Sequence, residues 1–424
     1  MELVARSLKI LHGQSLLKNN MQALQRILVV SAVTNLFLVA LVGVLLRCFP
    51  FFSYFPLTYK NLLHGHSHFA FGGWVMPAIL ALILKCFPDL QKAVDYRHWR
   101  NISFLLLFSA YGMLIAFSIQ GYKPVSIAFS TLSIMGGFYL VVVCWRVMSL
   151  IKPAASLNFL KAGLFYFVLS SVGPFATGPL IAFGQSGSPI YFDAIYFYLH
   201  FQYNGWFLFA VLAFFYKYLE QKGTATNGKK VFWLMNFACV PTYFLSVLWH
   251  QPSVLFNIVG GLGAVIQCAA LYFLLRDLRL LNFTNKPLKT LVYLSFISLS
   301  TKIILQLVSA FPDIALLAYH HRNFVIAYLH LVLLGFTSLF LLGWIIKVYA
   351  VTVNRELKAG IGLFIIAFVC SELLLIASPV ANILGYQIPV YALLLLLFSM
   401  LLPLGIALFS RRFVFQKDHD SILR

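Results

Sequence analysis

Three histidines stand at every second position in the stretch Leu63–Gly73, which reads LHGHSHFAFGG and opens a long apolar run. An imidazole in apolar surroundings costs free energy unless its ring nitrogens are paired, so these histidines are candidate ligands. If the stretch is helical, each residue turns by about 100°, which puts His64 and His68 on one face and His66 roughly 200° away. The three rings therefore cannot all bind one metal ion from an unbroken helix. One ring could bind a haem iron while its neighbours meet the membrane surface or the haem carboxylates.

Five further histidines also border or lie within apolar runs: His200, His250, His320, His321 and His330. Many neutral imidazoles beside few carboxylates are typical of haem or metal ligation. Any one of them alone is equally expected to be a histidine hydrogen-bonded at the membrane surface. The gathering of eight favours a ligand site, and the absence of C-x-x-C-H from the sequence excludes the usual covalent haem attachment.

Membrane helices must position these histidines. The chain has 424 residues, of which 61% are hydrophobic and only 10% charged, a composition foreign to soluble domains. Apolar stretches of about 20 residues, the length that spans a bilayer, recur along it. We number them spans 1 to 12, centred near residues 38, 74, 111, 135, 173, 204, 240, 264, 299, 335, 369 and 399. The sequence thus predicts one all-α membrane domain over 1–424: a cytoplasmic amphipathic segment 1–25, a twelve-span bundle 26–410 and a basic cytoplasmic tail 411–424.

The positive charges predict the orientation. If the N-terminus is cytoplasmic, nearly all of the 31 Lys and Arg residues fall in cytoplasmic segments. The outer loops hold only Arg47, Lys60, Lys123 and Arg322, and Lys302 lies inside a span. This asymmetry predicts that both termini are cytoplasmic, in an inner membrane of bacterial type. It also explains the net charge of +20 without a nucleic-acid partner. The eight histidines then all lie in the outer halves or at the outer ends of spans 2, 6, 7 and 10.

This pattern resembles subunit I of the haem-copper oxidase superfamily, which includes cytochrome c oxidases and bacterial nitric oxide reductases. In that family a span 2 histidine and the second histidine of an H-x-H motif in span 10 hold a low-spin haem. The first histidine of the H-x-H holds a high-spin haem. One histidine of span 6 and a pair at the end of span 7 hold the facing copper or iron.

The resemblance implies two ligands for a low-spin haem. In span 10, Ala327-Tyr328-Leu329-His330-Leu331 is similar to A-H-x-H-L, which makes His330 one ligand. In span 2 it implies His66, which precedes Met76-Pro77-Ala78 at the family's distance, while His64 and His68 remain rivals.

The second half of the family's site is altered. The segment 200–206, HFQYNGW, is similar to the reductase pattern H-L-W-V-E-G-V-W and implies His200 as a metal ligand, with Asn204 in place of Glu. His250 is followed by Gln251 where the family has a second histidine, and Tyr328 replaces the high-spin haem ligand.

Substitutes for the missing ligands are present in the sequence. Tyr328 could bind haem as a phenolate and is the one candidate catalytic residue. His320 and His321, just before span 10, could complete a rearranged copper site with His200 and His250, or could form a hydrated pair at the membrane surface.

We therefore expect a divergent oxidase-like membrane protein that transfers electrons through a bis-histidine b-type haem near the outer face, with a degenerate copper site or a second haem as further cofactors. The expected partners are the lipid bilayer, a cytochrome c or other respiratory subunits, and a small gas such as oxygen or nitric oxide. Proton-carrying groups are sparse, with Glu372 and Lys302 alone deep within spans. One alternative is an active oxidoreductase, a terminal oxidase or nitric oxide reductase with altered ligands. The other is a non-redox transporter of a metal ion or small solute.

Overall fold

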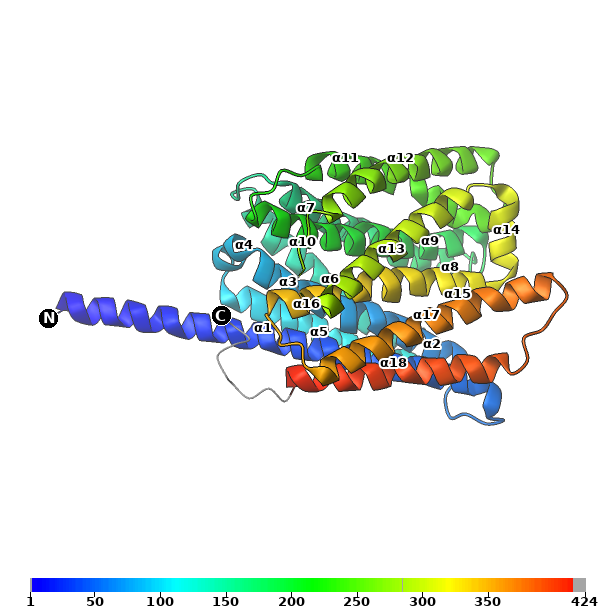
Figure 1. Cartoon of the computed structure of the whole chain (residues 1–424), viewed down its shortest axis with the longest axis horizontal. Coiled ribbons are helices and arrows are strands. Elements are labelled where there is room, and N and C mark those ends of the chain that lie inside the picture. Colours follow the sequence, from blue (N-terminus) through cyan, green and yellow to red (C-terminus); the bar gives the residue numbers. More distant parts are fainter. Residues whose placement is uncertain (1, 284, 415–424) are drawn as a thin grey trace. The chain divides into compact units, whose positions relative to one another are not determined.

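The structure is a computed structural model that describes residues 2–283 and 285–414. Helices form almost all of this part of the chain, and it contains no strand (Figure 1). The all-α prediction is therefore confirmed. Of the predicted basic tail, residues 411–414 are described, whereas 415–424, including His419, lie outside the described residues.

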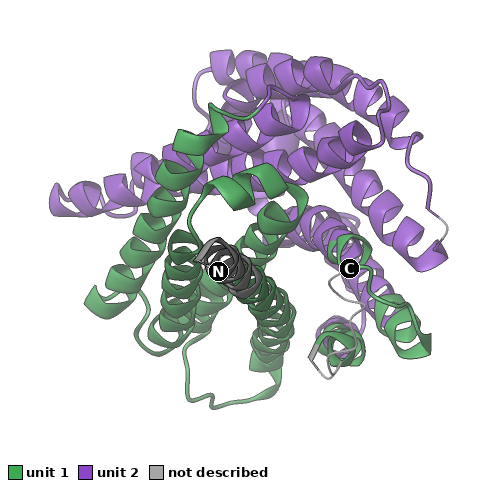
Figure 2. Cartoon of the chain, turned by 90° about the vertical axis from the view of Figure 1, so that its left-hand side faces the viewer, with its two compact units in different colours: residues 1–151, 345–362, 402–424 green, residues 152–344, 363–401 purple. Residues whose placement is uncertain are grey.

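The chain divides into two compact units (Figure 2). Unit 1 comprises Met1–Ile151, Ile345–Gly362 and Leu402–Arg424, and unit 2 comprises Lys152–Trp344 and Leu363–Leu401. Three helices contribute residues to both units: α16 (Leu339–Val348), α17 (Arg355–Ile383) and α18 (Tyr391–Val414).

Unit 1 carries the predicted span 2. Its elements are α1 (Glu2–Cys48), η1 (Phe49–Phe51), α2 (Tyr59–Phe69), η2 (Ala70–Val75), α3 (Met76–Cys86), α4 (Pro88–Ala93), α5 (Tyr96–Gln120) and α6 (Pro124–Met148). Helix α2 lies tightly against α5, because a Cβ on Gly65 would come within 3.1 Å of the carbonyl oxygen of Leu114. The buried amide of Asn35 joins α1 to η2 and α5, since it donates to the Gly73 carbonyl (2.7 Å) and accepts from the Tyr111 hydroxyl (2.6 Å).

Unit 2 carries the predicted spans 6, 7 and 10. Its elements are α7 (Ala155–Ser170), α8 (Val172–Ala182), α9 (Pro189–His200), η3 (Phe201–Phe207), α10 (Leu208–Gln221), α11 (Gly228–Cys239), η4 (Pro241–His250), α12 (Val254–Leu278), α13 (Lys286–Val308), α14 (Pro312–His320), α15 (Arg322–His330) and η5 (Leu331–Ser338). Its core is rich in large aromatic side chains, including Trp206, Tyr216 and Phe209, which are fully buried.

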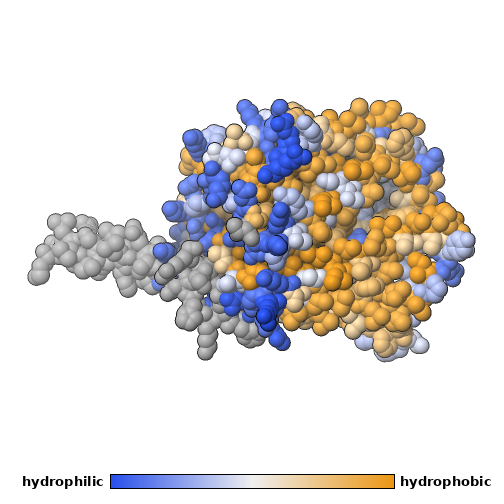
Figure 3. Space-filling view, viewed as in Figure 1, coloured by the Kyte–Doolittle hydropathy of each residue, from blue (hydrophilic) through white to orange (hydrophobic). Residues whose placement is uncertain are grey.

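Eleven helical segments of the described chain are long and apolar enough to cross a membrane. Apolar side chains cover most of the face seen in Figure 3, as expected of a surface that meets lipid. The chain is thus built as an integral membrane protein. The predicted span 6, centred near residue 204, corresponds to α9, η3 and α10, which are helical throughout 189–221 but are not among the eleven. Polar residues of its first half, among them Asp193, His200 and Asn204, lower its hydropathy, and the twelve-span count stays a prediction.

A buried carboxylate secures one end of unit 2. Asp277, only 1% exposed, accepts hydrogen bonds from the Tyr216 hydroxyl (3.0 Å), the Asn227 backbone (2.9 Å) and the Asn227 side chain (2.8 Å). These bonds join α10, α12 and the loop before α11. They also compensate for the cost of burying a charged group.

Replacing Asp277 with alanine leaves these three donors without their acceptor, so we expect the free energy of unfolding to fall by roughly 3 kcal/mol. Thermal unfolding of the purified protein in detergent measures the change. Glu356→Ala, which removes an exposed carboxylate in the first turn of α17, is the control. Equal unfolding midpoints for the two variants would contradict the structural role of Asp277.

Candidate functional site

The helix α2 separates the three span 2 histidines by face. His68 stacks on Phe117 (ring centroids 4.1 Å apart, planes 5° apart), and its Nε2 lies 2.9 Å from the Tyr122 hydroxyl. His64 meets the same Tyr122 ring edge-on at 4.7 Å. Both rings therefore face α5 and the residues that follow it.

His66 points the other way, toward α1. A Cβ built on Gly43 would lie 3.3 Å from Cε1 of the His66 ring, so the ring packs directly against that glycine. The expected division of the three rings between two faces is thus present. His68 already uses Nε2 within unit 1, whereas the roles of His64 and His66 as haem ligands stay predictions.

His200 is completely buried, and both ring nitrogens have protein partners. Its Nε2–H donates to the Cys239 carbonyl (2.8 Å), while Nδ1 accepts from the Asn204 amide (3.0 Å) and the Ser246 hydroxyl (3.3 Å). These partners determine the tautomer, with the proton on Nε2. A metal ion could bind either nitrogen only by displacing these bonds.

The buried side chain of Lys302 lies near this histidine. Its side chain is 2% exposed, and its ammonium makes no hydrogen bond to the described residues. It lies close enough to His200 and Cys239 to interact with both electrostatically. When this amine is protonated, its positive charge opposes the binding of a metal cation at His200.

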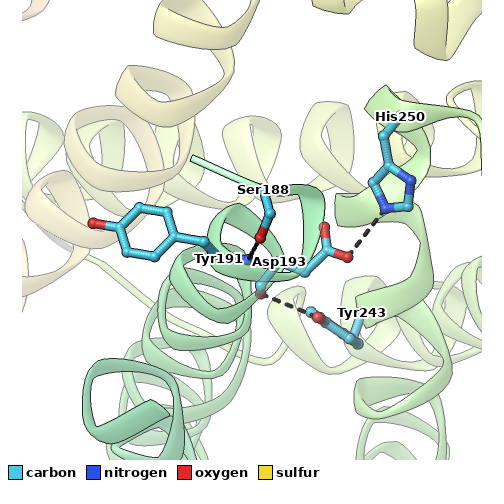
Figure 4. Close-up of polar contacts among 5 residues, drawn as sticks. All are labelled: Ser188, Tyr191, Asp193, Tyr243 and His250. Atoms are coloured by element: carbon cyan, nitrogen blue, oxygen red, sulfur yellow. Dashed lines mark hydrogen bonds and ion pairs between the residues drawn. The ribbon is translucent and has the colours of Figure 1, made fainter. Parts of the chain in front are cut away.

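His250 forms a pair with an acidic residue that sequence reasoning did not select. Its Nε2 lies 3.0 Å from Oδ2 of Asp193, and the Tyr243 hydroxyl donates to the Asp193 carbonyl (3.1 Å), as Figure 4 shows. The Ser188 hydroxyl accepts from the Tyr191 backbone at the start of the same helix. Asp193 lies seven residues before His200, which is two helical turns. This spacing puts both side chains on one face of the helix and could have identified Asp193 from the sequence.

His330, at the end of α15, faces the second carboxylate that sequence reasoning did not assign as a partner. Its Nδ1 lies 3.3 Å from Oε1 of Glu372, and the side chains are 29% and 10% exposed. Neither this Nδ1 nor Nε2 of His330 makes a hydrogen bond to the described residues. The neighbouring Tyr328 ring meets Tyr203 of η3 edge-on at 6.4 Å.

The remaining pair, His320 and His321, lies between α14 and α15. The His320 ring contacts Tyr319 (5.6 Å) and the His321 ring contacts Phe324 (6.0 Å). Within 2–283 and 285–414, no three histidine, cysteine or acidic side chains are close enough together to hold a metal ion. The structure does not gather His200, His250, His320 and His321 into such a group, and their metal role stays a prediction.

A shared backbone feature marks the histidine-bearing spans. π-Helical segments follow the candidate histidines of spans 2, 6 and 10: η2 follows α2, η3 begins directly after His200, and η5 begins directly after His330. Span 7 instead ends in the 3₁₀ segment η4, with His250 as its last residue and Gln251 left-handed (φ 54°). π-Helical turns are rare and concentrate at functional sites.

Side chains satisfy backbone groups of these irregular turns. Asn35 donates to the Gly73 carbonyl of η2 (2.7 Å). In η5, Thr337 donates to the Val332 carbonyl (3.0 Å) and Ser295 donates to that of Phe336 (2.8 Å). The irregular turns are thus hydrogen-bonded features of the fold.

Comparison with known proteins establishes the fold. No protein-family model matches the chain. No curated protein matches it either. Among solved structures, the chain is similar to one from a cryo-EM structure of a heme-copper terminal oxidase dimer, with a TM-score of 0.70 and 13% sequence identity over 94% of this chain and 86% of that chain. The chain therefore has the fold of that oxidase.

The contact between His68 and Tyr122 can be measured by a double-mutant cycle. We expect His68→Ala to destabilise more than Tyr122→Phe, because it also removes the stack on Phe117. The double variant should lose about 1 kcal/mol less than the sum of the single losses, the energy typical of one hydrogen bond. Chemical denaturation in detergent gives the values. Additive losses would show that the two side chains do not interact.

Proposed function

We propose that the protein is an oxidase-like membrane haem protein that transfers single electrons through a low-spin b-type haem, with His330 as one axial ligand. The observation that carries the proposal is the setting of His330. Its Nδ1 lies 3.3 Å from a carboxylate oxygen, neither ring nitrogen makes a hydrogen bond to the described residues, and a π-helical segment starts directly after it. Iron-binding histidines use one ring nitrogen for the metal and orient the ring through the other, so His330 fits this role.

The second axial ligand in the proposal is a histidine of span 2, with His66 preferred. His68 is the weaker rival because its Nε2 is engaged by Tyr122. His66 and His64 remain as candidate ligands. The resemblance to the oxidase family favours His66, because it precedes Met76-Pro77-Ala78 at the family's distance. The pairing of His66 with His330 rests on that resemblance, since the two residues belong to different units.

Haem, when bound, supplies a one-electron couple. The chain supplies the ligand and its surroundings: Glu372 lies 3.3 Å from Nδ1 of His330, and η5, which follows this histidine, has buried apolar residues such as Val332 and Phe336. The sequence lacks C-x-x-C-H, so the haem is bound without a covalent link.

The residues at the position of the family's second metal do not fit a copper ion. Both nitrogens of His200 are hydrogen-bonded, Nε2 of His250 is paired with Asp193, and the buried amine of Lys302 lies near His200. We therefore route no reaction step through a second metal. We therefore favour electron transfer over the reduction of a gas. We assign no catalytic step to Tyr328, whose ring packs edge-on against that of Tyr203.

The proposal includes a topology and partners. The distribution of Lys and Arg supports twelve spans with both termini in the cytoplasm, as in a bacterial inner membrane. An electron carrier of one-electron type, such as a cytochrome c or another respiratory subunit, is the partner that this chemistry requires.

Replacing His330 with alanine should abolish the low-spin haem spectrum, because the iron loses an axial ligand. Reduced-minus-oxidised visible spectra of the purified variant test this, with protein amount and size-exclusion profile recorded to show that the chain folds. His320→Ala, an exposed histidine ten residues earlier, is the matched control and should keep the wild-type spectrum. A His330→Ala protein with the full low-spin spectrum would rule out the assignment.

A further inference from the structure

Glu372 is a carboxylate in the middle of an apolar helix. It lies in α17, within the run VCSELLLIAS, and is only 8% exposed. Removing an ionised carboxylate from water costs several kcal/mol unless compensating contacts exist. Its place in the fold therefore requires an explanation.

The packing of α17 against span 10 places Glu372 beside His330. A Cβ on Gly335 would lie 2.5 Å from the Phe368 ring, so α17 approaches η5 closely at that glycine. Glu372 stands one turn beyond Phe368 and contacts His330, and Leu375 packs with Ala327 one turn further. Along these three contacts the residue numbers rise in α17 and fall in span 10, as expected of two antiparallel helices. The Glu372–His330 contact therefore belongs to the register of the helix pair.

The contact leaves a particular nitrogen available. Oε1 of Glu372 lies 3.3 Å from Nδ1 of His330 in an electrostatic contact without a hydrogen bond. Nε2, the nitrogen farther from the backbone, faces no such carboxylate and makes no hydrogen bond to the described residues. In the pair of Asp193 with His250 the carboxylate takes Nε2 instead. Of the two pairs, Glu372 and His330 thus have the arrangement that suits a metal-binding imidazole whose other N–H is directed at a carboxylate.

We propose that Glu372 is a positioning residue that orients His330 and lowers the reduction potential of the haem bound by it, an inference that rests on the proposed function. A carboxylate beside Nδ1 favours the tautomer with the proton on that nitrogen and raises the basicity of Nε2. Its negative charge stabilises the oxidised iron, which carries one more positive charge than the reduced iron. At 3.3 Å the pair is a close electrostatic contact, longer than a short charge-assisted hydrogen bond.

The test is an equilibrium redox titration of the full-length protein carrying Glu372→Gln, followed by its visible spectrum. Glutamine keeps the shape and removes the charge. We expect the haem to remain low-spin and to be roughly tenfold more reduced at the wild-type midpoint, a positive shift of about 59 mV for a one-electron couple. Asp313→Asn, which removes an exposed carboxylate of α14, should leave the midpoint near the wild-type value.

Glu372→Asp is a second test variant. Its shorter side chain keeps the negative charge but places it farther from the His330 ring. Its midpoint should lie between those of the wild type and Glu372→Gln. Loss of haem from Glu372→Gln with retention in Glu372→Asp would also support a role exerted through the charge. A Glu372→Gln protein with haem bound and the wild-type midpoint would overturn the inference and leave the proposed function intact. A wild-type protein without haem would instead overturn the proposed function itself.

Discussion

The structure depends on one constraint: inside a bilayer, every backbone N–H and C=O must be bonded within the protein. Regular helices meet it with i→i−4 bonds, whereas the histidine-bearing spans contain π- or 3₁₀-helical segments. Where a π-helical segment leaves the regular ladder, side chains such as Asn35, Ser295 and Thr337 donate to its carbonyls. In η2 and η5, polar side chains thus add hydrogen bonds to irregular turns that follow candidate histidines.

The same low dielectric determines how the histidines are held. A buried imidazole needs partners, and three rings in unit 2 have polar ones: backbone and amide groups for His200, Asp193 for His250, and Glu372 for His330. The partners differ in kind. A ring with both nitrogens bonded to protein groups is structural, whereas a ring held at one nitrogen by a carboxylate has the other left to bind a ligand. This difference favours His330 over His200 as a haem ligand.

Much of this could be predicted from the sequence, but the partners could not. Composition predicted a helical membrane protein, and the 100° turn of a helix placed His66 opposite His64 and His68, as the contacts with Gly43 and Tyr122 show. Asp193 and Glu372 were not predicted as partners, because their contacts with His250 and His330 depend on which helix faces bring distant segments together. The π-helical turns were not predicted either, because no residue pattern in the sequence indicated them. Each turn changes which side chains face a neighbouring helix. The sequence also suggested a copper site made of His200, His250, His320 and His321. The fold does not bring three of these side chains close enough together to hold a metal ion.

The central claim is that this fold binds a b-type haem for electron transfer. The most direct test is the reduced-minus-oxidised visible spectrum of the purified wild-type protein, with pyridine haemochrome and metal analysis of the same sample. The account predicts a b-type haem in stoichiometric amount, with a sharp low-spin spectrum and no bound copper. A protein purified from haem-replete cells without haem would contradict it, and the histidines would then be those of a metal or solute site on an oxidase-like fold.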